Sequence, residues 1–119
     1  MIEDIKQAIE KFIKGGDNSD PSALEEILHP QYQNIQDGFF EKPGIFVISK
    51  ENYVQLVRDK VFGGKPRDIT YHSIEQKNNI AYATVSLESP THEFSSLITC
   101  VQEEGKWRII TNLPSIKTK

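Results

Sequence analysis

Several features that would narrow the function of this chain are scarce in its sequence. Cys100 is the only cysteine, so an intramolecular disulfide is excluded and a reducing compartment is expected. The longest apolar run, Ile45–Ile48, is far shorter than the roughly 20 residues that a membrane-spanning helix needs. The N-terminal segment alternates charged and aliphatic side chains, unlike the apolar segment of a signal peptide. These absences predict a cytoplasmic protein that makes no membrane contact.

Basic residues are also fewer than acidic ones. The 119 residues include 14 lysines and arginines against 17 aspartates and glutamates, and the basic residues are scattered. Domains that bind nucleic acids usually present a basic face, so a nucleic-acid partner is not expected. The histidines lack the paired spacing of metal ligands, and neither glycine pair precedes the Lys-Ser/Thr of a phosphate-binding loop. Neither a metal nor a cofactor is predicted.

What the sequence does contain is the pattern of one globular domain. Apolar residues make up 37% of the chain and charged residues 26%, which is ordinary for a soluble fold. The predicted domain spans residues 1–119, of which 115–119 are expected to form a loose tail.

The first half of the chain predicts three helices. Apolar residues between positions 2 and 13 recur at helical spacing, and Gly15-Gly16 is expected to end this helix. The second helix is predicted from Asp20-Pro21 to about residue 29. The third is predicted from Lys50 to about Phe62.

The second half predicts strands. Short β-rich pieces at Tyr32–Gln36 and Ile45–Ile48 precede four longer strands at Asp68–Glu75, Ile80–Glu88, His92–Gln102 and Trp107–Leu113. The turns between the longer strands are too short for a crossover helix, so neighbouring strands are expected to be antiparallel. The predicted fold class is α+β, with three helices of the N-terminal half packed on the concave face of a curved, mostly antiparallel sheet.

The last two strands carry apolar residues on both faces. Phe94 and Leu97 are expected to point to opposite sides, and Trp107 and Leu113 to lie opposite Ile110. Three short helices can cover only one face of the sheet. A second copy of the chain is therefore expected to bury the other face and form a homodimer. A strongly coiled sheet that covers itself is the alternative.

Four segments together resemble the nuclear transport factor 2-like superfamily, a cone-shaped, cystatin-like α+β fold shared with ketosteroid isomerase and the polyketide cyclases. They are Leu28-His29-Pro30 with Tyr32, Ile48-Ser49-Lys50-Glu51-Asn52-Tyr53, Phe94-Ser95-Ser96-Leu97 and Gly105-Lys106-Trp107-Arg108-Ile109-Ile110. Within the superfamily, the chain is most similar to the putative lumazine-binding branch.

This resemblance implies a curved mixed sheet wrapped around a pocket, and a homodimer joined through the sheets. For an enzyme of this fold it implies proton-transfer chemistry such as isomerisation, cyclisation or dehydration. Relatives often carry an acidic residue in the penultimate strand where this chain has Ser96. That departure weakens the transfer of acid–base chemistry, and the sequence leaves open whether the chain is an enzyme.

His72 and Glu93 are the candidate catalytic residues. Histidine is the most common general base at neutral pH, and a carboxylate desolvated among apolar groups can act as a base. The alternatives are a histidine held by hydrogen bonds at the sheet surface and a solvated charge near a strand end.

Tyr32, Tyr53 and Tyr82 are the candidate ligand-binding residues. Tyrosine combines apolar area with a polar tip, which suits a pocket wall that orients a small apolar or aromatic ligand. With His72 they are expected to line a pocket between the helices and the concave face. They are equally well explained as large core or rim residues.

Two functions of different classes stay open. The first is a small-molecule-binding domain with an unknown ligand, with or without weak proton-transfer activity. The second is a non-catalytic homodimeric module for protein interaction or assembly, whose interior is filled by Phe12, Phe62 and Trp107. A cavity above roughly 300 Å³ with at least two convergent polar groups favours the first, and a packed interior favours the second.

Overall fold

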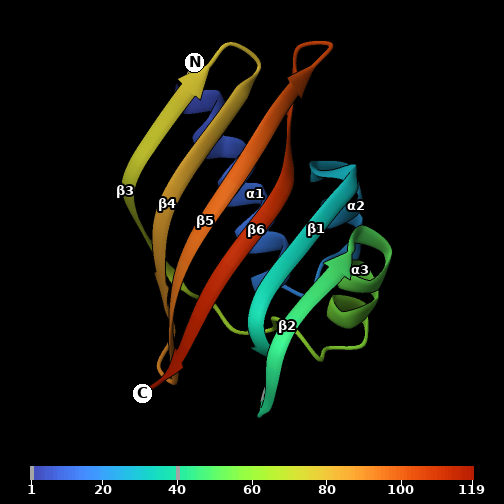
Figure 1. The fold of residues 1–119 in the computed structure, drawn as a ribbon. Helices are drawn as coiled ribbons and strands as arrows, with labels where there is room; N and C mark the ends of the chain where they lie inside the picture. Colours follow the sequence, from blue (N-terminus) through green and yellow to red (C-terminus); the bar gives the residue numbers. More distant parts are fainter. Residues whose placement is uncertain (1, 40) are drawn as a thin grey trace.

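A computed structural model describes residues 2–39 and 41–119 and shows three helices behind one six-stranded sheet (Figure 1). The elements are α1 (Ile2–Asp17), α2 (Pro21–Ile27), β1 (Leu28–Phe39), β2 (Lys42–Ser49), α3 (Lys50–Arg58), β3 (Asp68–Lys77), β4 (Ile80–Glu88), β5 (His92–Glu103) and β6 (Lys106–Thr118). The sheet order is β2-β1-β6-β5-β4-β3. The predicted α+β class is confirmed, with a curved sheet whose concave side holds the helices.

The pairing of β1 with β6 joins the two halves of the chain. These two strands run parallel, whereas every other neighbouring pair of the sheet is antiparallel. The pairing ends where Asn34 lies opposite Asn112. Beyond this point β1 continues against β2 alone and β6 against β5 alone. The sheet therefore divides at Asn34 and Asn112.

The core lies between the helices and the concave side of the sheet. Apolar residues of α1 at helical spacing, such as Ile5, Ile9 and Phe12, are buried there as predicted. Ala81, Ala83 and Val85 of β4 and Ile98, Cys100 and Ile109 of β5 and β6 complete the same cluster. Their alternation fixes the faces of the sheet, because successive residues of a strand point to opposite sides. We call the side away from the helices the outer face.

The predicted starts of the second and third helices are confirmed by side-chain caps, but the predicted helix ends are wrong. Asp20 accepts a hydrogen bond from the Ala23 amide at 3.2 Å, and Ser49 accepts one from the Asn52 amide at 3.3 Å. Helix α1 continues through Gly15-Gly16 to Asp17.

Packing explains why the glycine pair does not end the helix. A Cβ on Gly15 would lie 3.0 Å from Leu24 Cδ2, so glycine there allows α1 and α2 to approach closely. Helix α2 ends earlier than predicted, at Ile27, because strand β1 begins at Leu28. Helix α3 ends at Arg58.

Strand β6 differs from its prediction in two ways. Cys100 pairs with Ile109 and Thr99 with Thr111, so Ile110 is an extra residue, a β-bulge. The bulge moves Leu113 to the outer face, although it was predicted to share a face with Trp107. The residues expected as a loose tail are instead strand up to Thr118, which pairs with His92.

Candidate functional site

Two of the predicted ligand-binding tyrosines meet on the concave side. The ring centroids of Tyr32 on β1 and Tyr53 on α3 lie 5.3 Å apart, and Phe12 of α1 packs against both rings. Tyr32 is 1% exposed and Tyr53 9%. Further rings of Phe62, Phe39 and Phe46 extend this cluster toward the start of β2. The cluster thus runs from the core to a rim of partly exposed rings.

Tyrosine is protonated over the physiological range at its ordinary pKa of about 10, and burial moves the pKa of both residues further above that range. It raises the pKa of Tyr32 well above its ordinary value, an effect that the nearby Tyr53 reinforces and a hydrogen bond with Asn112 opposes. Burial also raises the pKa of Tyr53 to about 12. Neither hydroxyl can therefore serve as a base at neutral pH.

A row of buried polar side chains begins at the Tyr32 hydroxyl. This hydroxyl donates to Asn34 Oδ1 at 3.2 Å, and Asn112 Nδ2 of β6 donates to the same oxygen at 3.0 Å. Asn34 Nδ2 donates to Gln36 Oε1 at 2.7 Å, and Gln36 Nε2 donates to the Gly38 carbonyl at 2.9 Å. We call Tyr32, Asn34, Gln36 and Asn112 the amide row.

All four members of the amide row are buried, Gln36 and Asn112 slightly less deeply than Tyr32 and Asn34. Tyr32 and Asn34 are each 1% exposed, whereas Gln36 is 5% and Asn112 8% exposed. Gln36 lies directly opposite Phe46 of β2, so the row runs beside the aromatic rim. The Oδ1 atom of Asn112 is buried and has no hydrogen-bond partner among the described residues. A polar row with one unused acceptor is thus placed on the concave side where the sheet divides.

Sequence reasoning missed the three amides of this row. Tyr32, Asn34 and Gln36 alternate along one predicted strand, so period-2 analysis places them on the same face. That polar stripe was the available signal. Asn112 could not be connected to it, because only the parallel pairing of β1 and β6 brings the two asparagines together.

The other predicted site residues lie on the outer face, so they do not share a wall with Tyr32 and Tyr53. Tyr82 alternates with the fully buried Ala81 and Ala83, and a hydrogen bond with Glu75 raises its pKa. His72 sits at a register shift in β3, and its Nε2 lies 2.6 Å from Ser86 Oγ. The expected wall of three tyrosines and a histidine is not formed.

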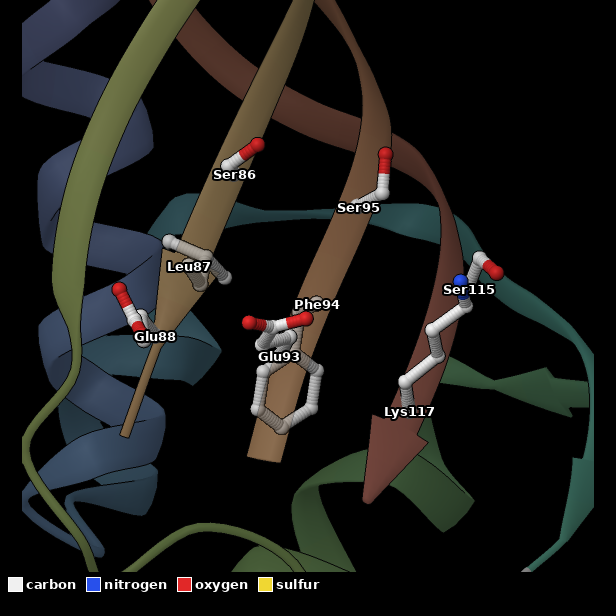
Figure 2. A pocket seen from close by; sticks show the side chains of 8 residues that line it. All are labelled: Ser86, Leu87, Glu88, Glu93, Phe94, Ser95, Ser115 and Lys117. Carbon is white, nitrogen blue, oxygen red and sulfur yellow. The ribbon is translucent and has the colours of Figure 1, made fainter. Parts of the chain in front are cut away.

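Glu93 lies beside an open groove on the outer face. The groove has a volume of about 350 Å³ and crosses the ends of β4, β5 and β6. Figure 2 shows Ser86, Glu93 and Lys117 around it on the three neighbouring strands. Glu93 is paired in register with both Glu88 and Lys117. It therefore stands among exposed charges and not in an apolar pocket.

The Ser86–His72 pair has the residue types of a nucleophile and its base, but its setting suits a structural contact. Nucleophilic catalysis at a serine needs free N–H donors for the developing oxyanion. Ser86 is paired in the ladder with both Thr70 and Ser95, so its backbone takes part in the sheet on both sides. We interpret the pair as a cross-strand hydrogen bond, and catalytic roles for His72 and Glu93 stay predictions.

A second open groove of about 590 Å³ lies where β1, β2 and β6 meet the start of α3. Gln33, Ser49 and Thr111 line it, and these residues face away from the amide row. Within residues 2–39 and 41–119, no His, Cys, Asp and Glu side chains gather into a set that could hold a metal ion. Over the same residues no helix has the length and apolar character of a membrane span.

Comparison with known proteins identifies the family. The sequence family described as "putative lumazine-binding" matches residues 1–113. The chain belongs to this family. A comparison with curated proteins found no match.

Solved structures show the same fold at low sequence identity. An NTF2-like protein of unknown function from Silicibacter pomeroyi has a TM-score of 0.83 and 19% identity, covering 98% of this chain and 95% of that one. A second NTF2-like protein of unknown function, from Shewanella baltica, has a TM-score of 0.83 and 15% identity, covering 99% and 94%.

An uncharacterised protein with a cystatin-like fold from Caulobacter vibrioides has a TM-score of 0.71 and 17% identity, covering 98% of this chain and 89% of that one. These likenesses establish an NTF2-like, cystatin-like fold for the putative lumazine-binding chain.

Proposed function

We propose that the chain is a small-molecule-binding domain whose site lies at Gln36 and Asn112 of the amide row on the concave side. The observation that carries the proposal is the unpaired Oδ1 of Asn112 at the end of a continuous network of buried side chains. Ligand sites are usually apolar and aromatic surfaces with a few placed polar groups. The amide row beside the rings of Tyr53 and Phe46 has this composition.

The free-energy cost of burying polar side chains favours a binding role for the row over a purely structural one. A buried polar group is costly unless it is hydrogen-bonded, by about 1–3 kcal/mol for an unsatisfied one. Apolar residues of similar shape would fill the same positions at less cost. Phe12 and Trp107 already fill the interior near α1, so the ligand is proposed at the rim end of the row, near Gln36 and Asn112.

The proposed activity is binding without an acid–base step. The amides of the row do not titrate, and burial holds the pKa of Tyr32 well above its ordinary value. Ser96, which is buried and stands where relatives often carry an acidic residue, supplies no carboxylate. The description of the family supports a heteroaromatic ligand such as lumazine as the first compound to try.

A ligand screen by two-dimensional NMR tests this proposal. Lumazine, riboflavin, steroids and small aromatic acids are added while the side-chain amide signals of Asn34, Gln36 and Asn112 are followed. We expect at least one compound to shift these signals and to raise the unfolding temperature, since a ligand that binds only the folded state stabilises it. Shifts confined to the outer face, or none, would contradict the proposal.

Matched variants separate binding from folding. Asn112→Leu removes the unsatisfied oxygen together with the Nδ2 donor to Asn34, whose Oδ1 keeps the Tyr32 hydroxyl as a donor. We therefore expect unfolding stability to change little while the ligand-induced shifts are lost. Ser86→Ala on the outer face is the control for binding and should leave the ligand-induced shifts unchanged. If Asn112→Leu instead lowers stability by more than about 2 kcal/mol, Asn112 has a structural role.

A second candidate function is homodimer formation through the outer face. Val47 pairs with Ile35, Leu113 pairs with Leu97, and Ile35 and Leu113 follow the paired Asn34 and Asn112 on adjacent strands. We call these four residues the apolar row. Val47 is 59% exposed, Leu113 40% and Leu97 37%, and none of the helices of the described chain covers them (Figure 1).

The apolar row supports a second copy of this chain as its partner, because its four residues lie on the same side of the sheet and a two-fold axis would place that side against itself. Such a dimer is compatible with a ligand on the concave side. Sedimentation at micromolar concentration is expected to show a species of twice 13.6 kDa. A 13.6 kDa species at all concentrations would remove the dimer from the account.

A further inference from the structure

We infer that the ligand of the amide row is an uncharged molecule that donates an N–H or O–H hydrogen bond to Asn112 Oδ1. This inference rests on the proposed function and adds the polarity of the ligand. Its basis is the direction of every hydrogen bond in the row, which one backbone carbonyl determines.

The carbonyl of Gly38 fixes the first amide. A backbone carbonyl can only accept, so the group that Gln36 presents to it at 2.9 Å must be Nε2. Gly38 lies at a register shift in β1 with a φ of +93°, a backbone conformation that side chains strain. At this register shift the Gly38 carbonyl accepts from the Gln36 side chain.

The orientation of Gln36 then determines the orientation of each following amide in the row. With Nε2 on Gly38, Gln36 presents Oε1 to Asn34, and only Asn34 Nδ2 can donate to it, at 2.7 Å. Asn34 therefore presents Oδ1 on its other side, where its two lone pairs accept from the Tyr32 hydroxyl and from Asn112 Nδ2. A flipped Asn112 would place its oxygen against that of Asn34, which is unfavourable.

The last oxygen in the row is the one that remains unused. Because Asn112 must give Nδ2 to Asn34, its Oδ1 points away from Asn34, and this atom is buried without a partner. Asn112 as a whole is only 8% exposed, so bulk solvent does not satisfy the oxygen. A site with a fixed acceptor of this kind selects a donor and rejects a molecule that presents only acceptors.

Charge on the ligand is disfavoured by the surroundings. Neither the row nor the rings beside it carries a charge, and a charged group buried there would have no counter-ion. The charges that act on Tyr53, those of Asp17 and Arg67, are already paired with each other at 2.6 Å. An uncharged aromatic molecule with one N–H group meets both requirements.

Matched ring compounds test the inference. Indole has one N–H donor, 1-methylindole has the same ring without the donor, and quinoline carries only an acceptor. Each is titrated into the full chain, and its dissociation constant is measured from the side-chain amide shifts of the row. We expect indole to bind at least tenfold more tightly than 1-methylindole or quinoline.

A variant tests whether Gly38 sets the direction. Gln36→Met keeps the length of the side chain but cannot transmit the orientation, so Asn34 and Asn112 become free to flip. We expect the tenfold preference for indole over quinoline to fall toward equality, while Ser86→Ala keeps it. Should Gln36→Met not fold, a through-hydrogen-bond NMR coupling between Gln36 Nε2 and the Gly38 carbonyl in the natural chain supplies the same test.

The outcomes distinguish the two levels of the proposal. If no compound of this set or of the wider screen shifts the row, the proposed function fails and this inference fails with it. If quinoline or 1-methylindole shifts the row and binds as tightly as indole, only the inference is overturned. A bound-state structure in which a water molecule keeps Asn112 Oδ1 and the ligand lies elsewhere also overturns it.

Discussion

Because Tyr53 is buried among aromatic rings, its ionisation makes the stability of the fold depend on pH. Its ring packs against Phe12, Tyr32 and Phe62, and burial raises its pKa to about 12. In the unfolded chain the same hydroxyl ionises near its ordinary value of about 10. The unfolded state releases this proton at a lower pH than the folded state. The free energy of unfolding therefore falls as the pH rises between these two values.

We therefore predict an alkaline loss of stability centred on Tyr53. Its contribution is complete below pH 10 and declines toward pH 12, by about 1.4 kcal/mol per pH unit in that window. Urea unfolding at several pH values measures this slope. Tyr53→Phe should lower this slope, and part of it should remain because burial also raises the pKa of Tyr32. Tyr82→Phe should change the slope less, because the pKa of that outer-face tyrosine is raised mainly by a hydrogen bond with Glu75. A natural chain whose stability is constant from pH 10 to 12 would contradict the account of this site.

The same residues show what sequence can and cannot tell about a site. Tyr32 and Tyr53 were predicted to line one region and do meet, whereas Tyr82 lies on the opposite face. The small residues Ala81 and Ala83 take the buried positions of β4. Side-chain size therefore does not identify the buried face of this strand. Bulges such as those at His72 and Ile110 depend on pairing with another strand and leave no local signal.

At the scale of elements, the helices are held by contacts between distant parts of the chain. The last residue of α1, Asp17, accepts hydrogen bonds from Arg67 Nε at 2.6 Å and from the Arg67 amide at 3.1 Å. The side chain of Asp17 is 6% exposed and that of Arg67 17%. The pair ties the C-terminal end of α1 to the segment that enters β3. The Arg67 guanidinium also lies 4.7 Å from the centroid of the Phe94 ring.

We predict that breaking this tie costs much more than breaking an exposed ion pair. Asp17→Asn leaves a largely buried Arg67 without its counter-charge and should lower the unfolding free energy by roughly 3 kcal/mol. Glu26→Gln, which removes the exposed partner of Lys11, is the control and should change little. Chemical denaturation measures both variants. Equal small effects would mean that the Asp17–Arg67 pair does not anchor α1.

The starts of α2 and α3 could be predicted from sequence, whereas the ends of the helices and the full lengths of β1, β2 and β6 could not. The caps Asp20 and Ser49 bind amides three residues along the chain, so their signal is local. The end of α1 depends on Leu24 and Arg67, and the length of β6 depends on its partner β5. Long-range contacts of this kind override the local preference of Gly15-Gly16 for ending a helix.

At the scale of the whole molecule, the sheet offers one covered and one uncovered face. The helices lie on the concave side with the amide row, while the apolar row crosses the outer face (Figure 1). A homodimer through the outer face remains our proposal, and so does the cytoplasmic location. Both faces can act at once, since nothing in the proposed dimer requires the residues of the amide row.

A dimer makes stability depend on protein concentration. We predict that the unfolding temperature of the natural chain rises with concentration, since association favours the folded state. Leu97→Lys places a charge in the apolar row and should abolish this dependence. Val61→Lys, at an exposed apolar residue outside the sheet, should preserve it. Differential scanning calorimetry over a hundredfold range of concentration measures the effect. An unfolding temperature that is constant for the natural chain would contradict the dimer.

The central claim is that a ligand binds at Gln36 and Asn112 of the amide row, and a crystal structure with the best compound of the screen tests it most directly. The account predicts density for the compound beside Phe46, with a donor atom within hydrogen-bond distance of Asn112 Oδ1. Density for that compound only in the outer-face grooves, with the amide row sealed by protein side chains, would contradict it.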